Sequence, residues 1–324
     1  MHQMSKHRVA TLILTFIFAQ TANAKTNELT SLTADGWYQY RVPIADNAGS
    51  PCCQHTGQSD FCQLTASSRN LTINTSLTAK NLVILFKQRS NQIEDVVLIG
   101  DHCRVDSGGH SVKELTSVTS QQSLDMLQAL STSTDHHLAT LVTAAIALHH
   151  DDDATQRLIR IAFDKQHVSQ HDAIFWLGEA RRHQGFQALL GLIENTELPM
   201  SARKQAVFAL SLYQHADAAN ALQSLARTHS NHHIQKEAIF WVAESSQHNA
   251  FTLLNDLTGP TYPQSIQKEA VFGLSRLSGK RATPALINLV QHARSKVVRE
   301  AALFWLGQSE DPDARVFLTQ ILTR

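Results

Sequence analysis

The sequence has no excess of charge of either sign. Its 324 residues carry 28 Lys and Arg against 28 Asp and Glu, a formal net charge of +0 at pH 7. Nucleic acid or an anionic membrane calls for a basic surface, so we do not expect a polyanion partner. Charged residues make up only 17% of the chain, which is too little for a disordered charged tail, while 43% hydrophobic residues suffice to bury a core.

Catalytic signature motifs are also absent. The chain contains no Gly-x-Ser-x-Gly turn, no His-Glu-x-x-His motif, no glycine-rich phosphate loop and no Gly-x-Gly-x-x-Gly motif. These motifs hold a nucleophile, a metal or a phosphate at a fixed spacing. The sequence therefore predicts a protein that is not an enzyme and that needs no cofactor.

Residues 1–24 are typical of an export signal. Lys6 and Arg8 form a positive start, residues 9–19 form an apolar run, and residues 22–24 read Ala-Asn-Ala, a small-x-small cleavage site. The apolar run has about half of the roughly 20 residues that a membrane-spanning helix needs, and no later run is long enough. We expect cleavage near Ala24, a periplasmic or secreted location, and no membrane span after signal removal.

Four cysteines lie close together, at Cys52, Cys53, Cys62 and Cys103. Thiols in an oxidising compartment are usually paired, so we predict two disulfides. Because adjacent cysteines can bond to each other only in a strained ring, Cys52 and Cys53 should each pair with one of the other two. We favour Cys53 with Cys62 and Cys52 with Cys103, but sequence alone does not fix the connectivity.

The alternative interpretation of this cluster is a metal or small-ligand site, or a metal-dependent enzyme. Its candidate ligands are Cys52, Cys53, His55, Cys62, His102 and Cys103. Zinc accepts thiolate and imidazole ligands, although the paired Cys-x2-Cys spacing of structural zinc sites is missing. A redox-active thiol pair is the third interpretation.

Residues 25–115 have the composition of a small β-rich domain. Two apolar runs at 82–86 and 96–99 flank Ser-Asn-Gln at 90–92, as in a hairpin. A domain of this size is marginal on its own core, so two disulfides would add the missing stability. Residues 116–134 would connect it, as a helix or linker, to the rest of the chain.

Residues 135–324 repeat themselves. Five copies of an apolar phrase, Asp-Ala-Ile-Phe-Trp-Leu-Gly in the first, are 33, 32, 32 and 32 residues apart. Their central phenylalanines are Phe175, Phe208, Phe240, Phe272 and Phe304. The same offsets carry Leu189 and Leu192 onto apolar residues in every later copy. Each copy therefore predicts two amphipathic helices, near 170–181 and 184–195 in the first, and a degenerate sixth copy precedes them.

The repeated phenylalanine has two interpretations. In a stack, the first helix of each unit touches the first helices of its neighbours, so we favour a ladder of rings that packs between units. The alternative is an aromatic stripe on the convex surface that binds a partner. Tryptophan follows the phenylalanine in alternate units, with a small residue between, which we also interpret as packing.

This pattern, with Ala, Leu and Gly or Ser in the first helix and Ala-Leu-x-x-Leu in the second, resembles the HEAT-like repeats also found in phycobilin lyases. The resemblance covers roughly residues 135 to 324. It implies a mainly α fold, an α-solenoid of about six two-helix units whose second helices line the concave side. Another HEAT group, the deoxyhypusine hydroxylases, uses paired His-Glu metal ligands, and no His-Glu dipeptide occurs here.

These features together predict an exported scaffold that binds another exported or envelope protein in the solenoid groove. The candidate groove residues are the polar ones on the second helices, namely Gln187, Asn220, Gln223, Thr252, Asn255, Asn288 and Gln291. The last unit has no obvious polar cap, and Val316, Phe317 and Leu322 suggest a weak homodimer through the carboxyl-terminal repeat.

Overall fold

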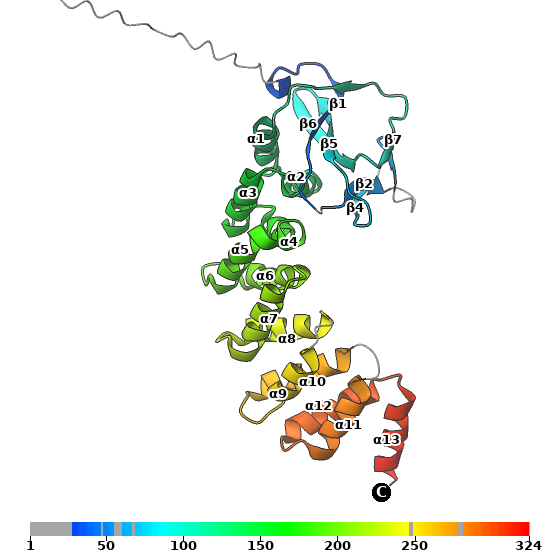
Figure 1. Cartoon of the computed structure of the whole chain (residues 1–324), viewed down its shortest axis with the longest axis vertical. Helices are drawn as coiled ribbons and strands as arrows, with labels where there is room; N and C mark the ends of the chain where they lie inside the picture. Colours follow the sequence, from blue (N-terminus) through cyan, green and yellow to red (C-terminus); the bar gives the residue numbers. More distant parts are fainter. Residues whose placement is uncertain are drawn as a thin grey trace, which may run out of the picture.

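A computed structural model describes residues 28–46, 48–54, 60–66, 69–245, 249–277 and 281–323. The predicted signal peptide and His55 lie outside these residues. The described residues form a short 3-10 helix at Glu28–Thr30, eight strands and thirteen α-helices (Figure 1). The strands are β1 (Gly36–Pro43), β2 (Ser50–Gln54), β3 (Phe61–Gln63), β4 (Asn70–Asn74), β5 (Asn81–Arg89), β6 (Gln92–Gly100), β7 (Arg104–Asp106) and β8 (Val112–Glu114). The helices are α1 (Ser120–Leu130), α2 (His136–Leu148), α3 (Asp152–Phe163), α4 (Gln170–Glu179), α5 (Arg182–Glu194), α6 (Met200–Leu212), α7 (Ala216–Thr228), α8 (His232–Glu244), α9 (Ala250–Leu257), α10 (Gln264–Arg276), α11 (Ala282–His292), α12 (Lys296–Gly307) and α13 (Pro312–Leu322).

A four-stranded sheet in the order β6-β5-β1-β8 is the centre of the β-rich region. Strands β5 and β6 form the predicted hairpin and pair antiparallel. Ser90 and Asn91 at its turn have φ angles of 50° and 61°, which match the twist of a two-residue hairpin turn. Strand β1 pairs antiparallel with β5 and parallel with β8.

The two faces of this sheet are covered differently. Ile84 and Phe86 belong to a buried core that continues into α1, α2 and the later helices. Val83 and Leu85 point the other way, because side chains alternate along a strand, and pack with the cysteines. The β-rich region was expected to rely on its own small core and its disulfides; instead, it shares a core with the helices. The exact division into domains stays a prediction.

Two disulfides close the far face of the sheet. They join Cys52 to Cys103 and Cys53 to Cys62, with Cα–Cα distances of 5.4 and 4.9 Å. Strand β2 carries both adjacent cysteines and is thereby tied to β3 and to the segment after β6. These are the two pairs that the sequence favoured.

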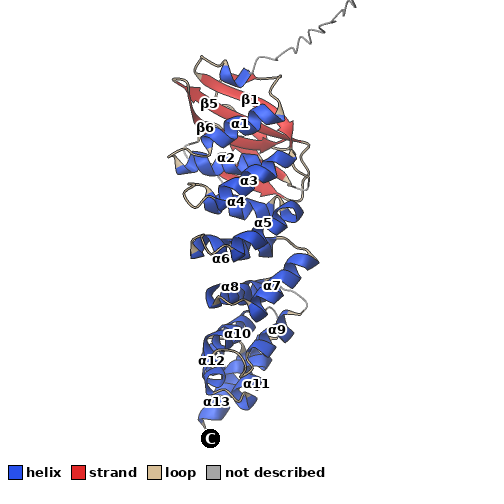
Figure 2. Cartoon of the chain, turned by 90° about the vertical axis from the view of Figure 1, so that its left-hand side faces the viewer, coloured by secondary structure: helices blue, strands red, loops and turns tan. Residues whose placement is uncertain are grey.

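The helices stack into a long array with the sheet at one end (Figure 2). We call α4, α6, α8, α10 and α12 the inner row and α5, α7, α9 and α11 the outer row. Each helix of the inner row packs extensively on the next one, whereas successive outer-row helices make few contacts. Closer packing marks the inside of a bend, and Figure 1 shows α3, α5 and α7 on the bulging side. The resemblance implied that the second helices of the units line the concave side; the structure puts the first helices there instead.

A second repeated position ties the rows together. Near the start of each inner-row helix, a Gln or Arg side chain donates hydrogen bonds to carbonyl groups at the end of the preceding helix or in the segment just after it. Gln170 bonds Ala162 O at 3.0 Å, and Gln235 bonds Ala226 O at 3.0 Å. The full set is Gln170, Arg203, Gln235, Gln267 and Arg299. These bonds satisfy carbonyls that a helix end leaves without partners.

Candidate functional site

The phenylalanines of the inner row form a continuous aromatic ladder with two tryptophans. Ring centroids lie 6.3 Å apart between Phe175 and Phe208, and 4.5 Å apart between Phe208 and Trp241. The same alternation continues to the last unit, where Phe272 lies 4.8 Å from Trp305. The members of the aromatic ladder are Phe175, Phe208, Phe240, Trp241, Phe272, Phe304 and Trp305.

The aromatic ladder both packs and faces solvent. Its rings stack between units, as favoured from the sequence, but they remain half-buried rather than buried. Phe304, at the end of the ladder, is 57% exposed. Because the ladder lies on the inner row, the stripe is on the concave side, not on the convex surface that the alternative interpretation named. Aromatic rings presented in a row on a curved surface are suited to holding a polypeptide segment.

A carboxylate bridges two helices beside the ladder. Glu237 on α8 accepts a hydrogen bond from Trp241 Nε1 at 2.9 Å and forms an ion pair with Lys204 Nζ of α6 at 2.7 Å. Two units further along, Lys268 and Trp305 occupy the places of Lys204 and Trp241, while alanine stands at 301 in the place of the glutamate.

A cavity of about 970 Å³ opens at this alanine, between α10 and α12. The cavity is lined by the aromatic residues Phe272, Phe304 and Trp305 and by both acidic and basic residues. Its charged residues are Lys236, Lys268, Glu269 and Glu300. Burial raises the pKa of Glu269, against the pull of Lys236. Glu300 is paired with Lys296 at 3.5 Å.

The groove residues predicted from the sequence lie on the outer row. Six of the seven are exposed and Gln223 is half-buried. Gln187 lies on α5, Asn220 and Gln223 on α7, Thr252 and Asn255 on α9, and Asn288 and Gln291 on α11. The structure thus brings them to the convex side of the array, away from the aromatic ladder. Their role in partner binding stays a prediction.

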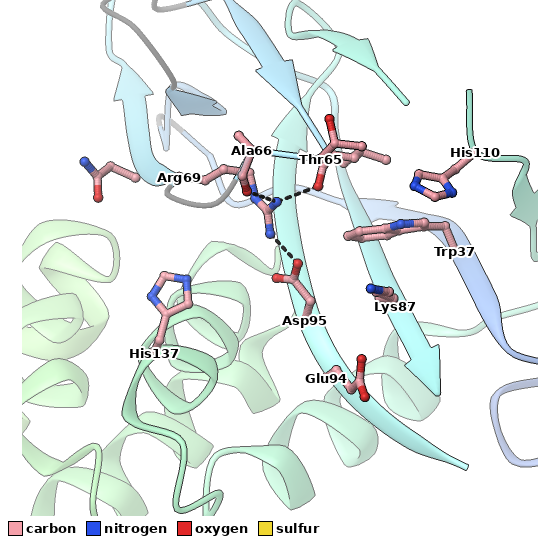
Figure 3. A pocket seen from close by; sticks show the side chains of 11 residues that line it. Trp37, Thr65, Ala66, Arg69, Lys87, Glu94, Asp95, His110 and His137 are labelled. Carbon is pink, nitrogen blue, oxygen red and sulfur yellow. Dashed lines mark hydrogen bonds and ion pairs between the residues drawn. The ribbon is translucent and has the colours of Figure 1, made fainter. Parts of the chain in front are cut away.

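A second cavity, of about 760 Å³, lies beside the β-rich region. Figure 3 shows Arg69 reaching Asp95, with His137 and His110 at opposite sides. The guanidinium of Arg69 forms an ion pair with Asp95 and donates to Leu64 O at 2.6 Å. Lys87 and Glu94 add one charge of each sign to the lining. Since its charges balance, this cavity does not select a ligand by net charge.

A buried chain of polar groups joins the sheet to the helices. Tyr40 Oη lies 2.8 Å from Ser123 Oγ, which lies 2.9 Å from Nε2 of His149. A hydroxyl beside an imidazole resembles an activated nucleophile, but all three side chains are fully buried, so no substrate reaches them. Burial, followed by the nearby charge of Arg181, lowers the pKa of His149 to about 4.

The predicted Cys/His ligand site is not assembled in the described residues. All four cysteines are in disulfides and so provide no thiolate. His102 lies 3.3 Å from the carbonyl of Thr78, and His55 falls outside the described residues. Within the described part of the chain, no three His, Cys, Asp or Glu side chains gather closely enough to hold a metal ion.

The carboxyl-terminal helix exposes apolar side chains. Val316 is 56% and Leu322 is 84% exposed, whereas Phe317 is buried. A homodimer through this helix stays a prediction. Separately, none of the described helices combines the length and the apolar character needed to cross a bilayer.

Comparison with known proteins gives one family match and several similar structures. The family model described as "PBS lyase HEAT-like repeat" matches residues 298–324. No curated protein matches. Among solved structures, human deoxyhypusine hydroxylase in complex with glycerol is 12% identical, covers 62% of this chain and 89% of its own, and has a TM-score of 0.27. The complex of CpcE and CpcF of phycocyanin lyase from Nostoc is 18% identical, covers 49% of this chain and 100% of its own, and has a TM-score of 0.36.

These comparisons correct one prediction from the sequence. The prediction that the chain is not an enzyme is contradicted by the repeat model that matches residues 298–324, because that model is described by the name of a lyase. The missing motifs are those of other catalytic folds, so their absence could not exclude this class.

The repeat match and the stacked helices agree on the architecture. The five units found in the sequence correspond to helices α4 to α13, and the matched residues cover most of α12 and all of α13. The protein is a helical-repeat protein whose repeats resemble HEAT repeats, with a small β-containing region at its amino-terminal side.

Proposed function

We propose that the protein binds a segment of another polypeptide along the aromatic ladder of the inner row. The observation that carries this proposal is the row of half-buried rings that ends in the 57% exposed ring of Phe304. Water contact with so many aromatic rings is unfavourable, and a bound segment would remove it. Aromatic side chains are also the commonest energetic anchors of protein interfaces.

Site-specific photo-crosslinking tests this proposal. A benzophenone side chain at Phe208, in the middle of the ladder, should give an adduct with a defined partner in the cells that make the protein. The matched control carries the same group at Gln187, an exposed position on the adjacent outer-row helix α5. Adducts from Gln187 alone would place the partner on the outer row, where the groove residues predicted from the sequence lie.

We also propose that the chain is exported and that its partner is an exported or envelope protein. Two disulfides in the β-rich region support this, because such bonds persist in oxidising compartments. Intact-mass spectrometry of the unreduced protein from the exporting cells should give a chain that starts at Lys25. Its mass should be about 4 Da below the reduced value, from two hydrogens lost per bridge. A chain that retains residues 1–24, with free thiols, contradicts export.

A further inference from the structure

The last unit of the inner row lacks a carboxylate that an earlier unit contains. Between α6 and α8, Glu237 links the ammonium of Lys204 to the indole N–H of Trp241. A shift of 64 residues along the sequence turns Lys204 into Lys268 and Trp241 into Trp305, while Glu237 becomes Ala301. Both donors are thus kept, and only the acceptor between them is replaced.

The two donors are left without a substitute acceptor. Among the described residues, Lys268 has no ion pair and the indole N–H of Trp305 has no hydrogen bond. Lys268, Ala301 and Trp305 all line the cavity of about 970 Å³ between α10 and α12. The cavity therefore lies beside the position of the missing side chain, and Phe272 and Phe304 also line it.

The charges around the cavity suit a carboxylate at this point. Two carboxylates already line it. Glu300 is paired with Lys296, and the buried Glu269 is attracted by Lys236 and Lys204 and repelled by Glu237. Lys268 lines the cavity and, in the described part of the chain, forms no ion pair with either of these acids. Lys268 and Trp305 are the counterparts of the two residues that both bind the carboxylate of Glu237 in the earlier unit.

We propose that this cavity binds an acidic side chain of the partner polypeptide, with its carboxylate between Lys268 and Trp305. An apolar residue next to that acid would pack against the aromatic lining of the cavity, to which Phe272 and Phe304 contribute. This inference rests on the proposed function, because it names the chemistry that the aromatic ladder recognises at its carboxyl-terminal end. The ligand class is thus a Glu or Asp side chain that is adjacent to an aromatic or large aliphatic one.

The test uses two capped dipeptides, acetyl-Phe-Glu-amide and acetyl-Phe-Gln-amide, which differ only in charge. The readout is the indole N–H resonance of Trp305, identified with Trp305→Phe, in the full-length protein. The glutamate peptide should move this resonance downfield, and the glutamine peptide should need about tenfold more peptide for the same shift, since bonds to charged groups are stronger. Equal shifts from both peptides, or no shift, overturn the inference.

Ala301→Glu supplies the missing carboxylate within the chain. It should move the Trp305 resonance downfield without peptide and abolish the response to the glutamate peptide. Lys268→Ala, at an exposed position, is the second variant and should weaken glutamate binding about tenfold without affecting the glutamine peptide. Crosslinks from Phe208 without any response at Trp305 overturn this inference alone. A response at Trp305 without crosslinks from Phe208 overturns the proposed function of the ladder instead.

Discussion

Replacing Gly178 by alanine should lower the free energy of unfolding by about 3 kcal/mol, the upper end for overpacking a core. Gly178 lies on α4 where that helix crosses α6 in the inner row. A Cβ atom there would lie 2.0 Å from the carbonyl oxygen of Ala209 and 2.6 Å from its carbonyl carbon. These are backbone atoms, so the two helices have to move apart, and the packing of the inner row is disturbed at that point. Urea unfolding followed by circular dichroism measures the loss.

Gly307 provides a matched control at the same position of the last unit. A Cβ atom there would meet nothing within 4 Å, because no further inner-row helix packs against α12 in the described chain. Gly307→Ala should therefore leave stability unchanged or raise it, by up to about 1 kcal/mol from the higher helix propensity of alanine. A similar loss of stability from both substitutions would mean that Gly178 is not needed for the close approach of α4 and α6.

The sequence was sufficient to predict the repeats but not the curvature of the stack. Residues that recur at a fixed spacing, such as Phe208 and Phe240, identify a unit whatever its surroundings, and they mark the inner-row helices correctly. Which row lies inside the bend depends on how closely successive helices pack, as at Gly178 against Ala209. That closeness is a property of pairs of units, so a single repeat does not reveal it.

Two recurring positions of the repeat can be seen in the sequence, but their roles can be recognised only in the folded structure. Gln235 and Arg203 occupy equivalent positions, yet their difference in residue type makes them look like ordinary surface residues. In the structure both are buried and bond carbonyl groups of the outer row. The change from Glu237 to Ala301 is likewise plain in the sequence. Its meaning depends on Lys204 of the neighbouring helix, which only the stacking places beside Glu237.

Chain geometry argued against a bond between the adjacent cysteines and left two possible pairings, and the structure has the one that was favoured. By contrast, the sharing of one core between the sheet and the helices could not be predicted. Tyr40 and Phe86 lie in segments where apolar and polar residues alternate, as in a strand. This alternation predicts that one face of the sheet is buried, but it does not show which element covers that face. The hydrogen bonds that link Tyr40, Ser123 and His149 cross this shared core, so they could not be predicted from the sequence either.

Acidification should destabilise the protein through His149. The pKa of this histidine falls from about 6.5 to about 4 on folding, mainly by burial, with the charges of Arg181 and Arg157 adding to the decrease and Asp151 opposing it. Between these two values the unfolded chain binds a proton that the folded chain does not, so stability rises with pH across this window. Lowering the pH from 6.5 to 4 should cost about 3 kcal/mol, with little further loss from this group below pH 4.

The variant His149→Asn tests this assignment because an amide can still bond Ser123 but does not titrate. It should reduce the slope of unfolding free energy against pH between 6.5 and 4, even if it lowers stability at neutral pH. Urea unfolding at several pH values measures the slope. An unchanged slope in His149→Asn would show that the acid sensitivity arises from other groups.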